Sequence, residues 1–352
     1  MAKLSQKQQK IIAIILEKGS LQSSAIHAEV VKAGDSISLV TVKRALSEMA
    51  AEKIIVATGA GRSLSYSVST IGKVFSNVNA KDYCAFDPDK RYGASKYNFD
   101  LFADFPDDIF ENDESALLNE STEAYERRIK DLSPVIQKKE LERLIIELSW
   151  KSSKIEGNTY TLLDTEKLIL ENKEALGHEK KESQMILNHK DAFNFVRENT
   201  DKFKSLNRFN LEELHSVLVK NLDINFGLRS GPVGVTGSKY QPLDNVYQIQ
   251  EAVVSLSSMI EKNKTPYAKA LLALLGISYI QPFEDGNKRT ARLMANALLL
   301  AYKKAPLSYR SVDEKEYREA TLVFYELNSI VPFKKIFIEQ YDFASRNYAV
   351  RP

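Results

Sequence analysis

The stretch QPFEDGNKRTAR, Gln281 to Arg292, is a polar interruption between two strongly apolar segments, residues 270–280 and 291–302. Pro282 stops the first apolar segment, and Gly286 permits a tight backbone before a second helix begins near Asn287. The apolar segments predict two buried helices, so the fold is expected to be mainly α-helical around this loop.

The loop carries more charge than a connection between buried helices needs. The first N–H groups of a helix lack partners and attract anions, which predicts an anion site at Gly286, Asn287 and Lys288. Arg289 and Arg292 lie three residues apart and share a helical face, where their guanidiniums suit phosphate oxygens. Asp285 is placed to hold a divalent cation, which makes the loop a predicted triphosphate and Mg²⁺ site. The plainer alternative is an ordinary helix that Asp285 caps.

The spacing GxxxxGK[ST] of a Walker loop is absent. The stretch instead resembles the signature HPFx[DE]GNGRxxR of the Fic family, also called Fido proteins. The resemblance implies a Fic-type helical core with a small β-hairpin flap. It also implies transfer of AMP from ATP to a hydroxyl of a target protein, with Mg²⁺ on Asp285 and the nucleotide on Gly286, Asn287, Lys288, Arg289 and Arg292.

Two further segments fit this resemblance. SSKIEGN, residues 152–158, is similar to the inhibitory SxxxEG motif, which implies an inhibitory helix near 140–157, with Glu156 reaching Arg292. Ser152 lies one helical turn before Glu156 and is expected to steady it. Residues 229–243, RSGPVGVTGSKYQPL, are similar to the flap hairpin, which would pair with an extended target segment through Val235, Thr236, Gly237, Ser238 and Tyr240.

Two positions depart from the Fic signature. Gln281 replaces the His that acts as general base, and an amide cannot accept the proton of a hydroxyl near neutral pH. The four His residues lie elsewhere; His27, His178, His189 and His215 are interpreted as structural or exposed. Lys288 replaces a Gly, as in the Doc branch, whose members transfer phosphate. The resemblance therefore leaves the reaction open.

The first 75 residues carry ten Lys and Arg against five Asp and Glu. Their pattern predicts helices over 5–18, 23–33 and from about 38, then two strands around Gly59-Ala60-Gly61, an order that resembles a winged helix-turn-helix. Such a module reads DNA with its third helix, here through Lys43 and Arg44, and touches the backbone with its wing, here through Arg62. A protein-docking role is the alternative.

The remaining chain divides by composition. Residues 98–125 hold nine acidic side chains and no Lys or Arg, so 76–125 is interpreted as an acidic connector without sustained periodicity. Residues 126–346 are assigned to the Fic domain, and one continuous helix is predicted over 124–155. The single cysteine, Cys84, excludes an internal disulfide, and no stretch predicts an export signal or membrane anchor, so a cytoplasmic protein is expected.

Three functional hypotheses follow. The leading one is an ATP-binding protein adenylyltransferase that Glu156 inhibits and Gln281 impairs, or a Doc-like phosphotransferase. The second is a DNA-binding transcription regulator whose Fic core senses ATP without chemistry, and the third is a module in which the flap only holds a peptide. ATP, Mg²⁺, an unidentified target protein and DNA at residues 1–75 are the expected partners, and a homodimer stays open.

Overall fold

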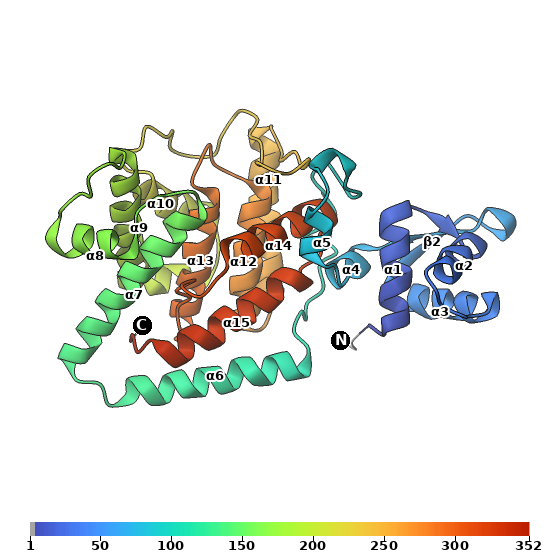
Figure 1. Ribbon diagram of the computed structural model, residues 1–352, viewed down its shortest axis with the longest axis horizontal. Helices are drawn as coiled ribbons and strands as arrows, with labels where there is room; N and C mark the ends of the chain where they lie inside the picture. Colours follow the sequence, from blue (N-terminus) through green and yellow to red (C-terminus); the bar gives the residue numbers. More distant parts are fainter. Residues whose placement is uncertain (1–3, 352) are drawn as a thin grey trace. The chain divides into compact units, whose positions relative to one another are not determined.

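The computed structural model describes residues 4–351, which are mainly α-helical (Figure 1). The chain forms two compact units. The N-terminal unit comprises the chain up to Pro106 together with Gly234–Gln241 and Lys315–Lys335, and the helical unit comprises Asp107–Val233, Pro242–Glu314 and the chain from Ile336. Each unit is therefore assembled from segments that are far apart in the sequence.

The N-terminal unit begins with three helices and a hairpin: α1 (Gln6–Lys18), α2 (Ser23–Lys32), α3 (Leu39–Ala51), β2 (Ile55–Thr58) and β3 (Ser65–Val68). The short strand β1 (Leu21–Gln22) completes a three-stranded antiparallel sheet of order β1-β3-β2. Ser5 and Ser38 cap α1 and α3 with their side chains. These elements lie where the sequence pattern predicts them, and the winged-helix interpretation stays a prediction.

The remainder of the N-terminal unit is less regular. It contains α4 (Thr70–Val74), α5 (Ala80–Cys84), the 3-10 turns Gly61–Ser63 and Pro88–Lys90, and most of α14 (Glu314–Leu327). The hairpin predicted over residues 229–243 is wrong in its strand pairing. A turn closed by the Ser238 amide on the Val235 carbonyl (3.1 Å) is present, but within residues 4–351 this segment forms only a single bridge, Lys96 with Gln241.

The helical unit is built around two antiparallel neighbours, α12 (Pro266–Ile280) and α13 (Asn287–Ala301), which pack against each other along their length. Helices on both sides enclose this pair (Figure 1). They are α7 (Pro134–Ile155), α8 (Leu162–Glu171), α9 (Lys180–Glu198), the 3-10 helix Thr200–Lys204, α10 (Arg208–Leu218), α11 (Val246–Lys262) and the second part of α15 (Val331–Asn347). Residues 281–286 thus connect the two most buried helices, as the sequence predicts, and the rest of the loop 281–292 forms the first turns of α13.

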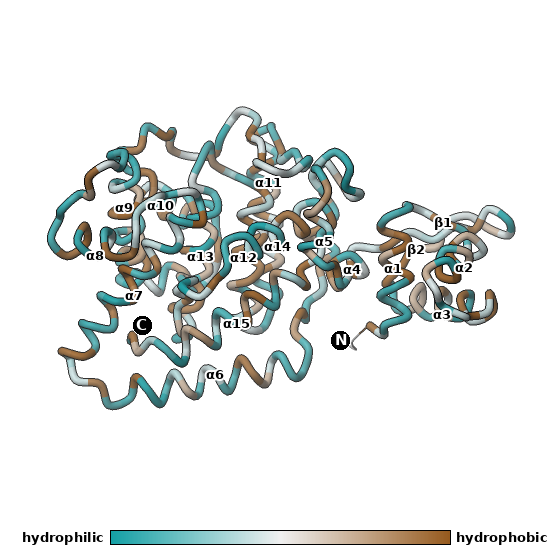
Figure 2. Tube along the Cα trace, viewed as in Figure 1, coloured by the Kyte–Doolittle hydropathy of each residue, from teal (hydrophilic) through white to brown (hydrophobic). Residues whose placement is uncertain are grey.

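Helix α6 (Asn112–Lys130) corrects two predictions. It occupies the last part of the expected acidic connector, from Asn112 onward, and it ends before α7 starts, so 124–155 is not one helix. The break follows from Pro134, which stands in the first turn of α7 behind the capping side chain of Ser133. Figure 2 shows α6 as mostly hydrophilic with apolar positions recurring along it.

Across residues 4–351 every helix is too short or too polar to cross a lipid bilayer.

Candidate functional site

The loop after α12 turns sharply at Gln281, which has left-handed backbone angles (φ 52°, ψ 60°). Its amide Nε2 donates to the Ser278 carbonyl (2.6 Å), so the side chain folds back on the helix end. Arg229 supports the same corner from another segment: its Nε donates to the Gln281 carbonyl (2.6 Å) and its backbone N–H to the Pro282 carbonyl (3.0 Å). The corner is therefore fixed by backbone acceptors.

The middle of the loop is anchored in the core by Phe283. Its ring stacks on the His215 imidazole with centroids 3.7 Å apart and planes 5° apart. The His215 Nε2–H donates to the Asp285 carbonyl (3.0 Å). Asn287 exchanges two hydrogen bonds of 2.8 Å with the backbone of Phe283. These contacts hold the loop against α10 and the start of α13.

The start of α13 is not capped by a side chain. Gly286 is the capping residue, with a left-handed φ of 79°, and the Asp285 carboxylate bonds the Gly286 N–H (2.6 Å) and not an N–H of the helix. The interpretation of Asp285 as a helix cap is therefore wrong. The first N–H groups of α13 are left to other partners, which is the arrangement that suits an anion.

Arg289 supplies an unused donor beside this helix start. Its side chain is 2% exposed, and its Nη2 lies 3.4 Å from the Asp285 carboxylate. Its Nη1 has no hydrogen-bond partner among residues 4–351. Burial lowers the pKa of Arg289, and the neighbouring Asp285 carboxylate opposes that shift. A buried guanidinium with a donor to spare fits an incoming oxyanion.

Arg292, fully buried, is already held by α7. Its Nη1 lies 2.8 Å from the Glu156 carboxylate, its Nε donates to the Ser152 hydroxyl (2.9 Å) and its Nη2 to the Ser152 carbonyl (2.8 Å). Lys288 adds a second, weaker ion pair with Glu156 at 3.4 Å. The predicted pair of Glu156 with Arg292 is present. The expectation that Ser152 steadies Glu156 is wrong, because the hydrogen bonds of Ser152 go to Arg292.

Glu156 is the residue that follows the last turn of α7, at its C-cap. Burial on its own raises the pKa of this carboxyl, but the charges of Arg292 and Lys288 and the hydrogen bond from Arg292 outweigh burial, so the pKa lies below its usual value. Glu156 is therefore an anion at neutral pH and takes up the positive charge that the loop presents.

Two histidines close to the loop were not assigned to it by sequence reasoning. His189 on α9 is fully buried, and neither ring nitrogen has a hydrogen-bond partner in the described chain. Burial, reinforced by the charges of Arg292 and Arg289, holds its pKa well below the usual value. His189 and His215 are thus neutral neighbours of the arginines. Arg229 was also missed, since its role depends on backbone acceptors that no sequence pattern reveals.

The residues present fit a magnesium ion only together with a substrate. Within residues 4–351 no three His, Cys, Asp or Glu side chains gather as a metal site. The Asp285 carboxylate is 69% exposed beside the open helix start. One carboxylate with phosphate oxygens and water is a common way for proteins to hold Mg²⁺.

The other predicted site residues lie in the N-terminal unit. The flap residues Val235–Tyr240 belong to its segment Gly234–Gln241, whereas the loop 281–292 belongs to the helical unit. Lys43 and Arg44 are exposed on α3, where Arg44 pairs with Glu48 at 2.9 Å, and Arg62 is exposed between β2 and β3. The DNA-contact and flap assignments stay predictions.

Comparison with known proteins assigns the region around the loop. A model of the Fic/DOC family matches residues 205–299. The curated "Protein adenylyltransferase Fic" of Nematostella vectensis is 33% identical over 175 residues, which are 48% of this chain and 41% of that protein. The chain therefore spans about two fifths of the length of that relative.

Solved structures show the same fold at low sequence identity. Fic-1 of C. elegans (aa134–508) superposes with a TM-score of 0.56 at 17% identity, over 67% of this chain and 71% of that one. A Fic family protein from Desulfovibrio desulfuricans G20 superposes with a TM-score of 0.56 at 23% identity, over 68% of this chain and 75% of that one. A Fic-domain signaling protein from Bacteroides thetaiotaomicron VPI-5482 superposes with a TM-score of 0.55 at 21% identity, over 65% of this chain and 94% of that one. Residues 205–299 of this chain are therefore a Fic/DOC family domain.

Proposed function

We propose that this protein binds ATP at the loop 281–292 and is a protein adenylyltransferase that is inhibited in its resting state. The observation that carries the proposal is the helix start of α13, which lacks a side-chain cap and lies beside the unpaired Nη1 of buried Arg289. Phosphate oxygens satisfy both at once. The named activity of the Nematostella vectensis relative, adenylyl transfer to protein, supports the choice of reaction.

The chain's own residues would divide the work of binding. The N–H groups of Asn287 and Lys288 and the guanidinium of Arg289 would hold phosphate oxygens, and Asp285 would hold Mg²⁺ next to them. Bound Mg²⁺ would neutralise charge on the phosphate oxygens. Phe283 and His215 fix the loop geometry, so little ordering is needed when the nucleotide arrives.

Glu156 would act as the inhibitor. Its carboxylate already pairs with Arg292 at 2.8 Å and with Lys288 at 3.4 Å, and a third phosphate of ATP would need the same cations. Because an anion already neutralises this site, binding of ATP must displace Glu156 or leave Arg292 out of the phosphate contacts. Removing the carboxylate should therefore tighten ATP binding.

Gln281 would make the transfer slow. Its Nε2 is committed to the Ser278 carbonyl, and its amide oxygen has no basicity near neutral pH. The loss of a positioned general base costs about 10² to 10⁴ in rate. We therefore expect detectable transfer only when Glu156 is also removed.

The test is label transfer with the full chain, a protein lysate as target source and ATP labelled at the α or the γ phosphate. Glu156→Gly should move the α label to protein, Gln281→His in the same background should raise the yield by about 10² or more, and Asp285→Ala should abolish it. Binding of a fluorescent ATP analogue, measured separately, should tighten by about tenfold in Glu156→Gly.

The outcomes separate the hypotheses. Transfer of the γ label and not the α label would establish a Doc-like phosphotransferase, for which Lys288 is the reason to look. ATP binding without transfer of either label, even with Gln281→His, would establish a silent nucleotide sensor. Absence of ATP binding in both wild type and Glu156→Gly would contradict the proposal itself.

A DNA-binding regulator is the second candidate, favoured by exposed cations on the third helix and the hairpin of the N-terminal unit. Lys43 has no ion pair among the described residues, and the Arg44–Glu48 pair is exposed and weak. Lys43→Ala with Arg44→Ala should weaken binding to duplex DNA by at least tenfold and make the salt dependence shallower. The exposed Lys81→Ala is a matched control on α5. Equal affinity of all three proteins would favour a docking role for this module.

A further inference from the structure

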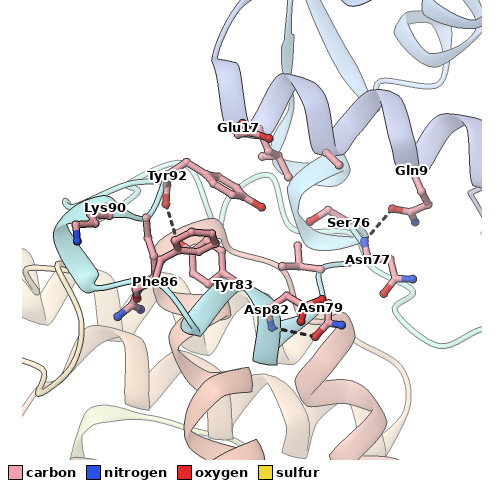
Figure 3. Close-up of a pocket in the computed structure, with 14 residues that line it drawn as sticks. Gln9, Glu17, Ser76, Asn77, Asn79, Asp82, Tyr83, Phe86, Lys90 and Tyr92 are labelled. Atoms are coloured by element: carbon pink, nitrogen blue, oxygen red, sulfur yellow. Dashed lines mark hydrogen bonds between the residues drawn. The ribbon is translucent and has the colours of Figure 1, made fainter. Parts of the chain in front are cut away.

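The N-terminal unit contains a pocket that shares no residue with the loop 281–292. Its volume is about 680 Å³, within the range of pockets that hold small organic ligands, about 300 to 1,000 Å³. Helix α1 forms one wall with Gln9 and Glu17, and α5 forms the facing wall with Asp82 and Tyr83 (Figure 3).

Three aromatic rings line this pocket. Tyr83 and Tyr92 meet edge to face with centroids 5.2 Å apart, and the Tyr83 hydroxyl oxygen lies 2.6 Å from the Tyr92 carbonyl oxygen, which fixes their positions. Phe86 is 61% exposed, so its ring is accessible at the pocket. The rings offer faces on which a flat aromatic ligand can stack.

The two cations at the pocket differ in their surroundings. Arg91 is buried against Glu326, at 3.0 Å, and also donates to the Gly237 carbonyl (2.7 Å). Lys90 pairs with Asp87 at 2.9 Å on the surface and lies at the edge of the pocket in Figure 3. Arg91 is therefore not free to receive an anionic ligand, whereas the exposed Lys90 pair is weak.

The anions at the pocket are less well neutralised. The Asp82 carboxylate is exposed and has no ion pair among residues 4–351. Glu17 pairs only with its neighbour Lys18, at 2.8 Å, on the surface, where such pairs contribute little. Glu17 and Tyr92 both line the pocket, and the pKa of Tyr92 is raised by burial and by the Glu17 charge.

We propose that this pocket binds a small aromatic cation, an aromatic ring that carries an ammonium group. The rings of Tyr92 and Phe86 would stack on the ligand and favour its positive charge, and Glu17 and Asp82 would neutralise the ammonium. Aromatic faces next to carboxylates, with the buried guanidinium of Arg91 already paired, disfavour an anion of the same shape.

The test uses the full chain and three matched probes: tryptamine, indole-3-propionate with the same ring and a negative charge, and n-butylamine with the charge and no ring. Titration followed by ligand-observed NMR should give saturable tryptamine binding in the millimolar range or tighter, about tenfold tighter than either other probe. The double variant Glu17→Gln/Asp82→Asn should weaken tryptamine binding by about tenfold. Asp89→Asn, on the adjoining turn and outside the pocket lining, should change nothing.

Tyr92→Leu is a second variant, which should weaken binding of tryptamine severalfold by removing a ring face. Unchanged thermal midpoints verify that the variants are folded. Equal affinity for tryptamine and indole-3-propionate, indifference of tryptamine binding to Glu17→Gln/Asp82→Asn in the folded protein, or no saturation at about 10 mM tryptamine would each overturn the proposal.

Discussion

Two arginines three residues apart on α13 are in different states. The charge of Arg292 is neutralised by Glu156, and both oxygens of Ser152 accept its hydrogen bonds. Arg289 has one exposed carboxylate at 3.4 Å and, among residues 4–351, no partner for its Nη1. A buried cation with incomplete partners costs free energy that a bound anion recovers. Under the proposed function, Arg289 would therefore receive the phosphate, and Arg292 would first have to be released from Glu156.

His215 makes the loop sensitive to acid. Burial lowers the pKa of His215 to about 4, below the value of about 6.5 for an unfolded chain, while the hydrogen bond to Asp285 opposes the shift. On acidification the unfolded state takes up the proton first, so stability present above about pH 6.5 is lost as pH falls toward 4. Urea unfolding at pH 7 and pH 5 measures how much free energy of unfolding each protein loses on acidification. We expect that loss to be about 2 kcal/mol smaller in His215→Gln than in wild type. An equal loss of unfolding free energy in wild type and His215→Gln would exclude a buried neutral His215.

Gly286 is required by both conformation and space. Its φ is 79°, and an added Cβ would lie 3.3 Å from Val219 and 3.5 Å from His215. Gly286→Ala should cost about 1 to 3 kcal/mol in the free energy of unfolding and weaken ATP binding. Gly177→Ala is the matched control, because Gly177 has a φ of 84° with nothing within 4 Å, so it isolates the conformational part. An equal loss of unfolding free energy in Gly286→Ala and Gly177→Ala, with ATP binding intact, would mean that contacts around Gly286 add nothing to the conformational cost.

Hydroxyl groups hold helix α6 against the other helices of the helical unit. The Thr122 hydroxyl lies 2.6 Å from that of Tyr267 and 2.7 Å from that of Tyr341, all buried. Thr122→Val should destabilise the protein by about 1 to 3 kcal/mol because two tyrosine hydroxyls lose a partner. Thr122→Ser keeps the hydroxyl and should cost about 1 kcal/mol for the missing methyl. Urea unfolding of both variants checks the order, and a Ser variant worse than Val would mean that packing dominates.

That polar attachment explains why sequence reasoning missed the start of α6. Its buried positions include Ser121, Thr122 and Tyr125, which carry little hydrophobic signal. The end of α12 and the start of α13 lie where the sequence predicts them, because both helices are apolar and Pro282 and Gly286 stand between them. In the site, the contact of Glu156 with Arg292 followed from the motif resemblance, but the roles of Ser152, His189 and Arg229 depend on which backbone atoms come close in space.

The N-terminal unit joins three distant parts of the chain at one buried ion pair. Arg91, 4% exposed, meets Glu326, 0% exposed, at 3.0 Å. The same carboxylate accepts from the Tyr83 hydroxyl and from the Ser238 hydroxyl, each at 2.7 Å. The turn at Gly237 and Ser238 is therefore held by residues of the first 106 and by α14, so any role of this turn in holding a target depends on them.

The two charges of the Arg91–Glu326 pair should depend on each other for their contribution to stability. Glu326→Leu or Arg91→Met alone leaves a buried charge without its partner and should cost about 3 to 5 kcal/mol. Arg91→Met/Glu326→Leu removes both charges and should cost clearly less than the sum of the single changes. Urea unfolding measures the cycle, and hydrogen exchange at Gly237 and Ser238 should speed up in each single variant. The exposed pair Arg44→Met/Glu48→Leu is the control and should show no coupling. Additive costs at Arg91 and Glu326, with unchanged exchange, would mean that the turn is held by its packing and not by this charge pair.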